Sequence, residues 1–576
     1  MGAPMFRHPN TKLLQAQRGW TVDAVLLAVI AAGLYLLLAV ASRGFVRATP
    51  SVTIDLHPAA LPRYALLSLL RMIAAYLLSL TFTLVVGYAA ARNRAAGRIL
   101  VPMLDILQSI PVLSFLPAVL LAMIALFPGS SIGIEFGSVL LIFTGMVWNM
   151  AFSFYHSLLT IPEELTEAAR AFRLSWWQRF ISLDLPAAVI GLVWNSMMSW
   201  AGGWFFLMAT EAFTLGKESF TLPGLGSYLF AAANNGDVPS ILWGLGTLIA
   251  LIVALDQLVW RPLIAWSERF KVEQSESQDV PTSWMLDFLN QSRLLPQTAR
   301  QIQTALARLR RHPGHAPAAR APAGRDVSEV ETGLLRLLGL AALAVAGWGF
   351  ISLVQLVWAL PLEKWLEISE GTGASVLRIA VALAISFAWT VPAGVAIGLH
   401  PRLARAAQPL AQIAASVPAT AVFPILLLLL VRLGGGLSIA SVLLMLLGTQ
   451  WYILFNTIAG AIALPRDLQE AASLMKIRGW MRWRTLILPG IFPHLVTGGL
   501  TAQGGAFNAT IVSEYVTFDN KVLQTIGLGA LISAAAAGGD YPLLAAATVT
   551  MAVVVVIINR LFWKRAAHLA EDRYHL

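Results

Sequence analysis

Ionisable side chains inside apolar segments are the first residues of this sequence that could do chemistry. Arg71 and Glu211 interrupt long apolar stretches. Arg378 and Glu514 do the same in the second half of the chain. A charge near the centre of a membrane helix costs roughly 2.5–3.5 kcal/mol on insertion scales, so such residues mark pathways or binding sites by default. The arginines could attract an anion along a pathway, or they could extend to outer lipid headgroups. For the two glutamates a structural or gating role is favoured over contact with a solute.

A second group of candidates for a pathway or gate consists of large or polar residues within apolar stretches. They are Trp200, Trp204, Gln503 and Asn508. Taken singly, Gln503 and Asn508 are better explained by hydrogen bonds between packed helices, and Trp200 and Trp204 by positions in the core or at the membrane interface. If they do line a pathway, its first-half wall is expected to be bulky and aromatic, and its second-half wall smaller and more polar.

Several other kinds of chemistry are excluded or unsupported. The chain has no cysteine, which excludes disulfides, thiol catalysis and cysteine metal sites. His156 and His494 have no partners at ligand spacing, so no metal site is predicted. No Gly-x-x-x-x-Gly-Lys-Ser/Thr loop occurs, so any ATP must be hydrolysed by another chain. Without a nucleophile–base pair, no enzyme activity and no catalytic residue are predicted.

The composition is that of a polytopic membrane protein. Of the 576 residues, 57% are hydrophobic and 12% are charged, against about 25% charged in average globular chains. A membrane helix needs about 20 mostly apolar residues, and twelve such segments are predicted. They lie near 21–41, 64–91, 100–127, 135–158, 188–211, 241–262, 334–359, 373–399, 406–431, 437–460, 491–514 and 543–563.

The chain is a tandem repeat. Glu167-Ala168-Ala169 recurs 303 residues later as Glu470-Ala471-Ala472, and the same offset pairs Glu211 with Glu514. Upstream the offset becomes 307, pairing Arg71 with Arg378. With six spans each, the halves share one orientation and form a parallel repeat, which places a pathway between them. The predicted units are a first half (1–266), a linker (267–332) and a second half (333–576).

Basic loops set the predicted orientation. The net charge of +10 comes from 40 basic and 30 acidic residues, and the bases cluster in loops on the side of the N-terminus. By the positive-inside rule that side is the cytoplasm, and both termini and the linker lie there. The excess charge therefore needs no nucleic-acid partner, and none is predicted. The arginine-rich part of the linker could lie on anionic lipid or on a partner, although a solvated tether is the simpler interpretation.

A long cytoplasmic loop lies between the fourth and fifth spans of each half. Ile161-Pro162 opens the first loop and Leu464-Pro465 opens the second, and in both a proline and early acids predict a helix start. The expected helices cover about 162–175 and 465–478. Their alanines would allow close approach by another surface, with apolar side chains beside them at Leu165, Phe172, Leu468 and Met475.

These paired loops resemble the "EAA" coupling loop of type I ABC importer permeases, and the spacing is most similar to the nitrate/taurine/sulfonate permease family. The resemblance also covers Ser68/Arg71, Ser375/Arg378, Pro111/Pro117, Pro418/Pro424, Glu211, Glu514 and the Gly-Leu-Gly at 224–226 and 527–529. It implies an all-α permease fold with about twelve spans in a bacterial inner membrane. It further implies that the loop helix enters a groove of an ATPase subunit.

The resemblance supplies the expected partners and the residues that would meet them. Two ABC ATPase subunits, or one fused or dimeric ATPase, would carry ATP and Mg²⁺, while this chain binds no cofactor. A periplasmic or lipid-anchored binding protein would deliver the solute. The charges of Arg71 and Arg378 predict that this solute is a small anion or zwitterion, such as a sulfonate, nitrate or small carboxylate. The residues expected to couple to the ATPase are Glu167, Ala168, Ala169, Arg173, Glu470, Ala471, Ala472 and Lys476.

The sequence departs from the family pattern in two ways and leaves alternatives open. Most members are single halves, whereas this chain is fused. Arg173 and Lys476 occupy places where the family has glycine, so either the turn differs or these bases contact an acid on the ATPase. The remaining alternatives are a permease for a metal or polyamine, a secondary transporter built of parallel repeats, or a channel.

Overall fold

The computed structural model describes two long parts of the chain. They are residues 52–270, apart from 129 and 216–217, and 347–573, apart from 433–435 and 519–520, with isolated positions at 32, 33, 35, 285, 286 and 344. The predicted span at 21–41, the first part of that at 334–359 and nearly all of the linker lie outside the described residues.

The described part of the first half is built almost entirely of helices, some of them joined by short π or 3-10 turns. Its elements are η1 (Pro58–Ala60), α2 (Leu61–Phe82), η2 (Thr83–Gly87), α3 (Tyr88–Arg92), α4 (Arg94–Ser109), η3 (Val112–Phe115), α5 (Leu116–Leu126), α6 (Ile132–Leu159), α7 (Glu163–Ala171), α8 (Trp176–Arg179), η4 (Phe180–Asp184), α9 (Leu185–Glu211), β1 (Ala212–Leu215), β2 (Glu218–Thr221), α10 (Leu225–Asn234), α11 (Val238–Leu255), η5 (Asp256–Trp260), α12 (Arg261–Ser267) and η6 (Glu268–Phe270).

The second half repeats this order. Its elements are α16 (Leu362–Leu399), α17 (Pro401–Ser416), α18 (Ala419–Arg432), α19 (Gly436–Ile462), α20 (Arg466–Leu474), α21 (Gly479–Arg482), η7 (Trp483–Ile487), α22 (Leu488–Ser513), β3 (Tyr515–Phe518), β4 (Lys521–Gln524), α23 (Leu528–Gly538), α24 (Tyr541–Ile558), η8 (Asn559–Trp563) and α25 (Lys564–Arg573).

Eight helical runs of the described residues are long and apolar enough to cross a membrane, and ten if each of two bent pairs is one span. The expected all-α polytopic fold is therefore confirmed. Most span ends agree with the sequence to within a few residues. The exception is α16, which begins at Leu362 rather than near residue 373.

The third span of each half was expected to be one continuous helix, and that expectation was wrong. α4 and α5 meet at 84°, and α17 and α18 meet at 77°. Prolines explain both breaks, because the residue before a proline is driven out of the helical region. Ile110, which precedes Pro111, has ψ 127°, and Val417, which precedes Pro418, has ψ 116°.

Side-chain contacts show that the first broken pair crosses the molecule once. Half-way along α2, Arg71 contacts Glu135 at the start of α6 and Glu211 at the end of α9. At the end of α3, Arg92 contacts Asp184, directly before α9. The chain between Arg92 and Glu135 must therefore pass from one end of the bundle to the other, so α4 and α5 form one bent span.

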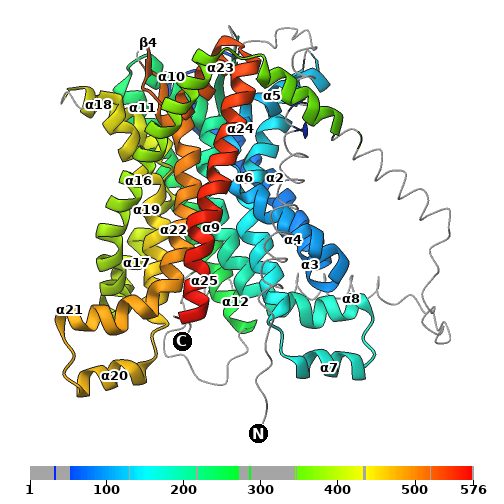
Figure 1. The fold of residues 1–576 in the computed structure, drawn as a ribbon, viewed down its shortest axis with the longest axis vertical. Coiled ribbons are helices and arrows are strands. Elements are labelled where there is room, and N and C mark those ends of the chain that lie inside the picture. Colours follow the sequence, from blue (N-terminus) through cyan, green and yellow to red (C-terminus); the bar gives the residue numbers. More distant parts are fainter. Residues whose placement is uncertain are drawn as a thin grey trace, which may run out of the picture.

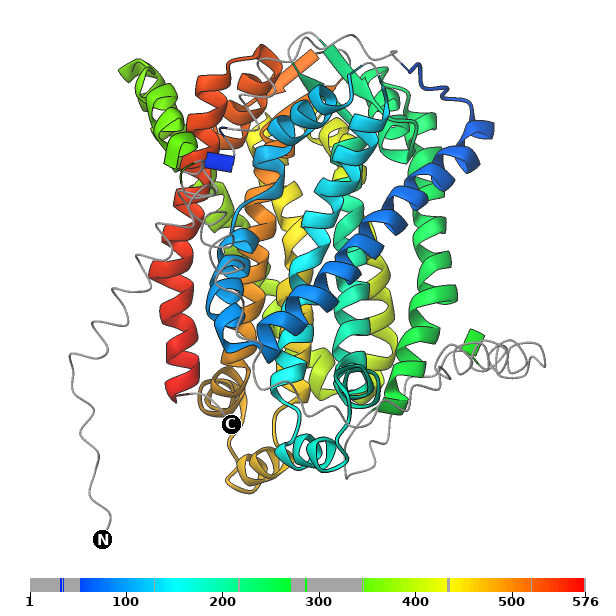
Figure 2. The same cartoon turned by 90° about the vertical axis from the view of Figure 1, so that its right-hand side faces the viewer.

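The two ends of the bundle differ. α7 and α20 lie at the same end, which we call the loop end, and α25 runs toward it (Figure 1). The hairpins β1–β2 and β3–β4 lie at the opposite end with α10 and α23, and we call it the hairpin end (Figure 2). The hairpins were not predicted from the sequence. Each pairs four residues antiparallel directly after the fifth span of its half.

The halves share one core, and the broken spans connect them. Buried Leu113 and Leu120 of the first half belong to the same apolar cluster as Phe507 and Met551 of the second. The amide of Leu113, freed at the break, donates to Asn508 Oδ1 at 3.1 Å. Thr548 Oγ1 donates to Ser114 O at 3.1 Å. The backbone groups released by the break are thus satisfied by the other half, as the membrane interior requires.

A repeated Gly-Asp pair starts the last span of each half. Gly236 and Gly539 have φ of 63° and 70°, a left-handed conformation that favours glycine. Asp237 then caps α11 by accepting from Ser240 N at 3.2 Å. Hydrogen bonds from the hydroxyl and the amide of Ser240 hold the pKa of the Asp237 carboxyl below its usual range. Asp540 caps α24 through Leu543 N at 3.1 Å in the same way.

Candidate functional site

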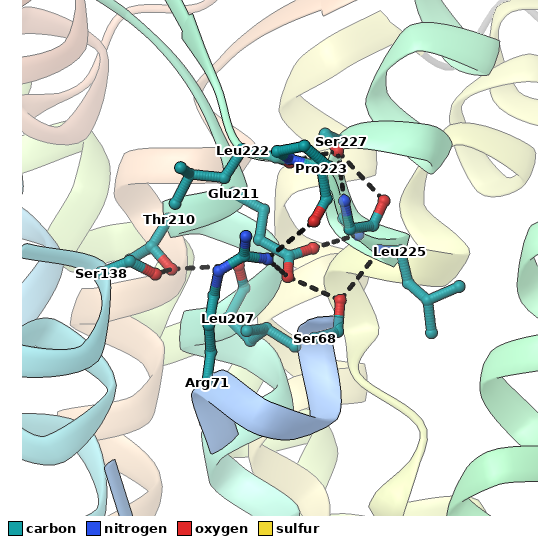
Figure 3. Close-up of polar contacts among 12 residues, drawn as sticks. Ser68, Arg71, Ser138, Leu207, Thr210, Glu211, Leu222, Pro223, Leu225 and Ser227 are labelled. Carbon is teal, nitrogen blue, oxygen red and sulfur yellow. Dashed lines mark hydrogen bonds and ion pairs between the residues drawn. The ribbon is translucent and has the colours of Figure 1, made fainter. Parts of the chain in front are cut away.

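The predicted pathway residue Arg71 is the centre of a buried ion network at the hairpin end (Figure 3). Its side chain is 4% exposed, and Nη1 lies 2.8 Å from Glu211 Oε1. Nε and Nη2 donate to the two oxygens of Glu135 at 2.6 and 2.7 Å, a bidentate pair. All three elements that carry these residues are long helices, namely α2, α6 and α9, so the network joins three spans of the first half.

Glu211 is fully buried, and its carboxylate is satisfied by donors besides Arg71. Oε1 accepts from Ser68 Oγ at 2.6 Å, and Oε2 accepts from Gly226 N at 2.6 Å. Ser68 Oγ in turn accepts from Leu225 N at 2.9 Å (Figure 3). The carboxylate thereby ties α2 and α9 to the first turn of α10, which explains why Ser68 and Gly226 recur together with it in the repeat.

The second half contains an equivalent network in which Arg378 has partly different partners. Arg378 Nη1 donates to Glu514 Oε1 at 2.8 Å, Ser375 Oγ donates to the same oxygen at 2.7 Å, and Gly529 N donates to Oε2 at 2.9 Å. The place of Glu135 is taken by Ser438, to whose Oγ Arg378 Nη2 donates at 3.4 Å. One arginine thus meets two carboxylates in the first half and only one in the second.

These contacts favour a structural role for Arg71 and Arg378 over the attraction of a solute anion. Each guanidinium is held by carboxylates of its own half, and the Arg71 side chain has almost no exposed surface. A paired charge in this position offers little field to a passing anion. Glu211 and Glu514, for which a structural or gating role was favoured, connect spans of their own half at the hairpin end.

The glycines that follow each buried glutamate are required by close approach. A Cβ added at Gly529 would lie 2.5 Å from the carbonyl of Thr510, and one added at Gly527 would lie 2.1 Å from Glu514 Oε2. The equivalent Gly224 would place a Cβ 2.3 Å from the Glu211 carboxylate. The Gly-Leu-Gly motif therefore lets the chain pass directly over the carboxylate that it binds.

Gly529→Ala is expected to lower the stability of the purified protein by about 1–3 kcal/mol, the usual range for overpacking a tight contact. The reason is that the Thr510 backbone, unlike a flexible side chain, cannot move aside. Thermal unfolding in detergent measures the effect. The control is Gly538→Ala at the other end of α23, where no atom lies within 4 Å of the added methyl group. Equal unfolding temperatures for the two variants would contradict the close-approach account.

A cavity of about 220 Å³ lies between the halves toward the hairpin end. Residues at matching positions of the repeat line it, for example Leu113 with Thr420 and Pro117 with Pro424. Arg71, Arg378, Glu211 and Glu514 are not among its lining residues. The central position between parallel halves is the one that the repeat predicts for a pathway.

The other predicted pathway residues have different positions from those expected. Trp200 and Trp204 lie in the core of the first half, where the Trp200 ring is 5.6 Å from Tyr76 and 5.8 Å from Trp260. Gln503 accepts from Trp563 Nε1 and lines a separate cavity within the second half. Asn508 bonds the broken span of the first half, as described above. None of these four side chains lines the central cavity.

The two predicted coupling helices are α7 and α20, and they are shorter than expected. Each ends at its ninth residue, Ala171 and Leu474, rather than at 175 and 478. Pro162 and Pro465 are the N-cap residues rather than the first helical residues. Both helices project from the loop end of the bundle (Figure 1).

One face of each coupling helix packs on its own chain and another is free. Ala169 and Ala472 are buried, each with 7% of its surface exposed, so they face the permease itself rather than an outside partner. Glu167 and Glu470 are exposed, and Ala168 and Ala471 are partly exposed. Phe172 and Met475, equivalent in the repeat, are 79% and 75% exposed. The repeat therefore exposes one large apolar side chain at the same place in each loop.

Arg173 and Lys476 take the conformation of the glycine that they replace. Their φ angles are 49° and 53°, and they are the only non-glycine residues with positive φ in the part of the chain that the structure describes. Leu174 N donates to Ala169 O at 3.1 Å and Arg173 N to Arg170 O at 2.9 Å, the Schellman pattern of a helix end. The loop turn is therefore retained, although a left-handed conformation costs an ordinary residue about 1–2 kcal/mol.

A buried acid near the first coupling loop was not predicted from the sequence. Asp184 has no exposed surface and contacts Arg92 and, at 3.5 Å, Arg179, while Tyr88 OH donates to it at 3.2 Å. It links the segment after α8 to the end of α2–α3. In the second half Ile487 and Leu399 take the places of Asp184 and Arg92 in an apolar cluster. The signal was present in the sequence, since an acid next to Leu185-Pro186 at a span start needs a partner.

Comparison with known proteins places both halves in one family. The profile described as "Binding-protein-dependent transport system inner membrane component" matches residues 83–261 and again 390–563. The predicted tandem repeat is thereby confirmed.

Individual relatives align with only part of this chain. The taurine transport system permease protein TauC of Escherichia coli (strain K12) is 26% identical over 217 residues, covering 34% of this chain and 75% of the relative. The nitrate import permease protein NrtB of Leptolyngbya laminosa is 25% identical over 175 residues, covering 29% and 61%. The riboflavin transport system permease protein RibX of Chloroflexus aurantiacus is 31% identical over 140 residues, covering 24% and 48%.

Proposed function

The chain belongs to the family of inner membrane components of binding-protein-dependent transport systems, and we propose that it forms the whole solute pathway of one ATP-driven importer. The observation that carries the proposal is the pair of family matches in one chain, each containing an exposed coupling helix at the same end of the bundle. Single-half permeases would supply these two surfaces as a dimer, whereas this chain supplies both.

The proposed solute is a small anion or zwitterion. Relatives are named for taurine, nitrate and bicarbonate, which are all small and oxygen-rich. Riboflavin, for which another relative is named, is much larger. The central cavity of about 220 Å³ is smaller than the roughly 300–1,000 Å³ of sites that hold drug-sized ligands, and this favours the small solutes.

The proposed partners meet opposite ends of the bundle. Two ATPase subunits, or one fused or dimeric ATPase, bind α7 and α20 and carry the ATP and Mg²⁺. Arg173 and Lys476, at the ends of these helices, contact acidic residues of the ATPase. A solute-binding protein docks at the hairpin end. The loop end then faces the cytoplasm of a bacterial cell, with both termini on that side of the inner membrane.

Reconstitution tests this function directly. The chain, its genomically adjacent ATPase and its binding protein are placed in proteoliposomes, and uptake of labelled taurine, nitrate and bicarbonate is compared with that of a polyamine and a divalent metal. We expect uptake of at least one anion that requires ATP hydrolysis. Uptake driven by a proton or sodium gradient without ATPase would instead indicate a secondary transporter, and uptake of the polyamine or metal alone would overturn the solute class.

A further inference from the structure

The walls of the central cavity are chemically unequal, although the repeat makes them equivalent in position. Among the lining residues, Thr420 is the repeat counterpart of Leu113, and Ser533 is the repeat counterpart of Phe230. Tyr515, at the start of β3, takes the place that Ala212 has in the first half. Threonine, serine and tyrosine hydroxyls therefore come from the second half, while the first-half residues at the same positions are apolar.

The composition of the two cavity walls agrees only in part with the prediction from the sequence. The second-half wall is the more polar one, as expected, but the aromatic residues are not concentrated on the first half. Phe423, Tyr515 and Phe518 of the second half line the cavity, against Phe230 of the first. Among the described residues that line the cavity, none carries a charge.

The hydroxyl of Thr420 is buried beside the cavity and lacks a hydrogen-bond partner. Its Oγ1 is buried and makes no hydrogen bond within the protein. Most other buried threonines in this bundle donate to a backbone carbonyl, as Thr457 does to Ile453 O at 2.7 Å. A buried hydroxyl left without a partner costs roughly 1–3 kcal/mol in proteins, so its persistence beside a cavity points to a partner that is present only part of the time.

Ser533 Oγ donates its one proton to Ile511 O at 2.9 Å and has none left for a solute. We propose that the central cavity is a solute-binding site in which the second half alone recognises the polar group of the solute, through the hydroxyls of Thr420 and Tyr515. The ligand is a small oxygen-bearing anion or zwitterion whose oxygens accept from these hydroxyls, while the first half provides an apolar wall. This inference rests on the proposed transport function and assigns the residues that select its cargo.

Recognition by neutral hydroxyls suits a transport site better than recognition by a guanidinium. A hydroxyl donates one hydrogen bond and is easily reoriented. A pathway site must bind strongly enough to admit the solute and weakly enough to release it. The two available arginines, Arg71 and Arg378, are held by carboxylates, so the structure keeps strong positive charge away from the cavity.

The test compares uptake with ATP hydrolysis in proteoliposomes that contain the ATPase and saturating loaded binding protein. Thr420→Val keeps the shape of the side chain and removes its hydroxyl. We expect it to lower solute transported per ATP hydrolysed by about threefold to tenfold, the worth of one hydrogen bond. Adding Tyr515→Phe should lower the ratio further, while ATP hydrolysis itself stays within about twofold of the parent, since the binding protein still docks.

Two further variants separate recognition from packing. Thr420→Ser restores a hydroxyl in a smaller side chain and should recover most of the transport ratio. Thr457→Val is the same exchange at a buried threonine outside the cavity and should leave the ratio unchanged. If Thr420→Ser is as defective as Thr420→Val, or if the Thr420→Val/Tyr515→Phe variant transports like the parent, the proposed site is wrong. Failure of the proposed function would appear differently, as absence of ATP-dependent anion uptake by the parent complex.

Discussion

Glu514→Ala is expected to destabilise the protein by about 3–5 kcal/mol, the usual cost of removing one partner from a buried ion pair. The variant leaves the Arg378 guanidinium, 12% exposed, with only the hydroxyls of Thr525 and Ser438. It also leaves Gly529 N and Ser375 Oγ without their acceptor. The measurement is the apparent unfolding temperature in detergent, together with the fraction of protein that elutes as a single species.

The first half supplies a matched control for this prediction. Glu135→Ser reduces the partners of Arg71 to one carboxylate, a serine hydroxyl and the carbonyl of Pro223, which resembles the one carboxylate and two hydroxyls around Arg378. Glu135 is also partly exposed, with 41% of its side-chain surface accessible, so its ion pair is screened by solvent. We expect this variant to lose no more than about 1 kcal/mol. An equal loss in the two variants would mean that burial does not control the energetics of the network.

The same network separates the structural role of the arginines from a role in the pathway. If Arg71 and Arg378 attracted the solute, replacing both by glutamine would reduce uptake and leave expression unchanged. The observed contacts predict the opposite, because Glu211 and Glu514 would each be buried without a counter-charge. The double variant should therefore lower the yield of folded protein more than it lowers uptake per folded molecule.

Much of the architecture could be predicted because the two halves of the chain repeat the same sequence pattern. The offsets of 303 and 307 identify the repeat, and apolar length identifies the spans. The partners of Arg71 could also have been inferred, since Ser68, Arg71 and Glu211 recur together and intramembrane charges usually pair with one another. Asp184 was missed because it and Arg92 are replaced by Ile487 and Leu399 in the second half, so the repeat gave no signal.

The positions of the pathway residues could not be read from the sequence. Which side of α9 or α22 faces the cavity depends on the rotation of a helix that is apolar all round, and periodicity gives no orientation there. The bends of 84° and 77° decide which residues reach the centre, and Pro111 and Pro418 indicate a break without fixing its angle. The left-handed Arg173 and Lys476 were unexpected for the opposite reason, because local preference argues against the conformation that the fold imposes.

The coupling helices present a surface whose parts can be tested separately. Phe172 and Met475 are the exposed apolar side chains at the ends of α7 and α20, and each is followed at once by a left-handed basic residue. The left-handed turn sets where the apolar side chain and the base project. A pocket of the ATPase that receives Phe172 or Met475 is therefore expected to have an acidic residue near Arg173 or Lys476.

Phe172→Ala with Met475→Ala is expected to weaken binding of the ATPase by at least about 2 kcal/mol per helix, the loss typical of a buried interface anchor. Folding should be unaffected, because both side chains are about three-quarters exposed in the isolated chain, at 79% and 75%. The measurement is co-purification and titration of the ATPase onto detergent-solubilised permease. Leu410→Ala, which is 69% exposed on α17 away from the coupling helices, is the control and should bind like the parent.

Arg173→Gly with Lys476→Gly completes the test by removing the charges while keeping the turn. Glycine adopts positive φ without cost, so stability should stay the same or rise slightly. If the bases contact acids on the ATPase, binding at low salt should fall and its dependence on ionic strength should flatten, since exposed charges act only within a Debye length of about 10 Å at 0.1 M salt. Unchanged salt dependence would show that the bases serve no electrostatic contact. Unchanged binding in the Phe172→Ala/Met475→Ala variant would show that α7 and α20 are not the ATPase surface.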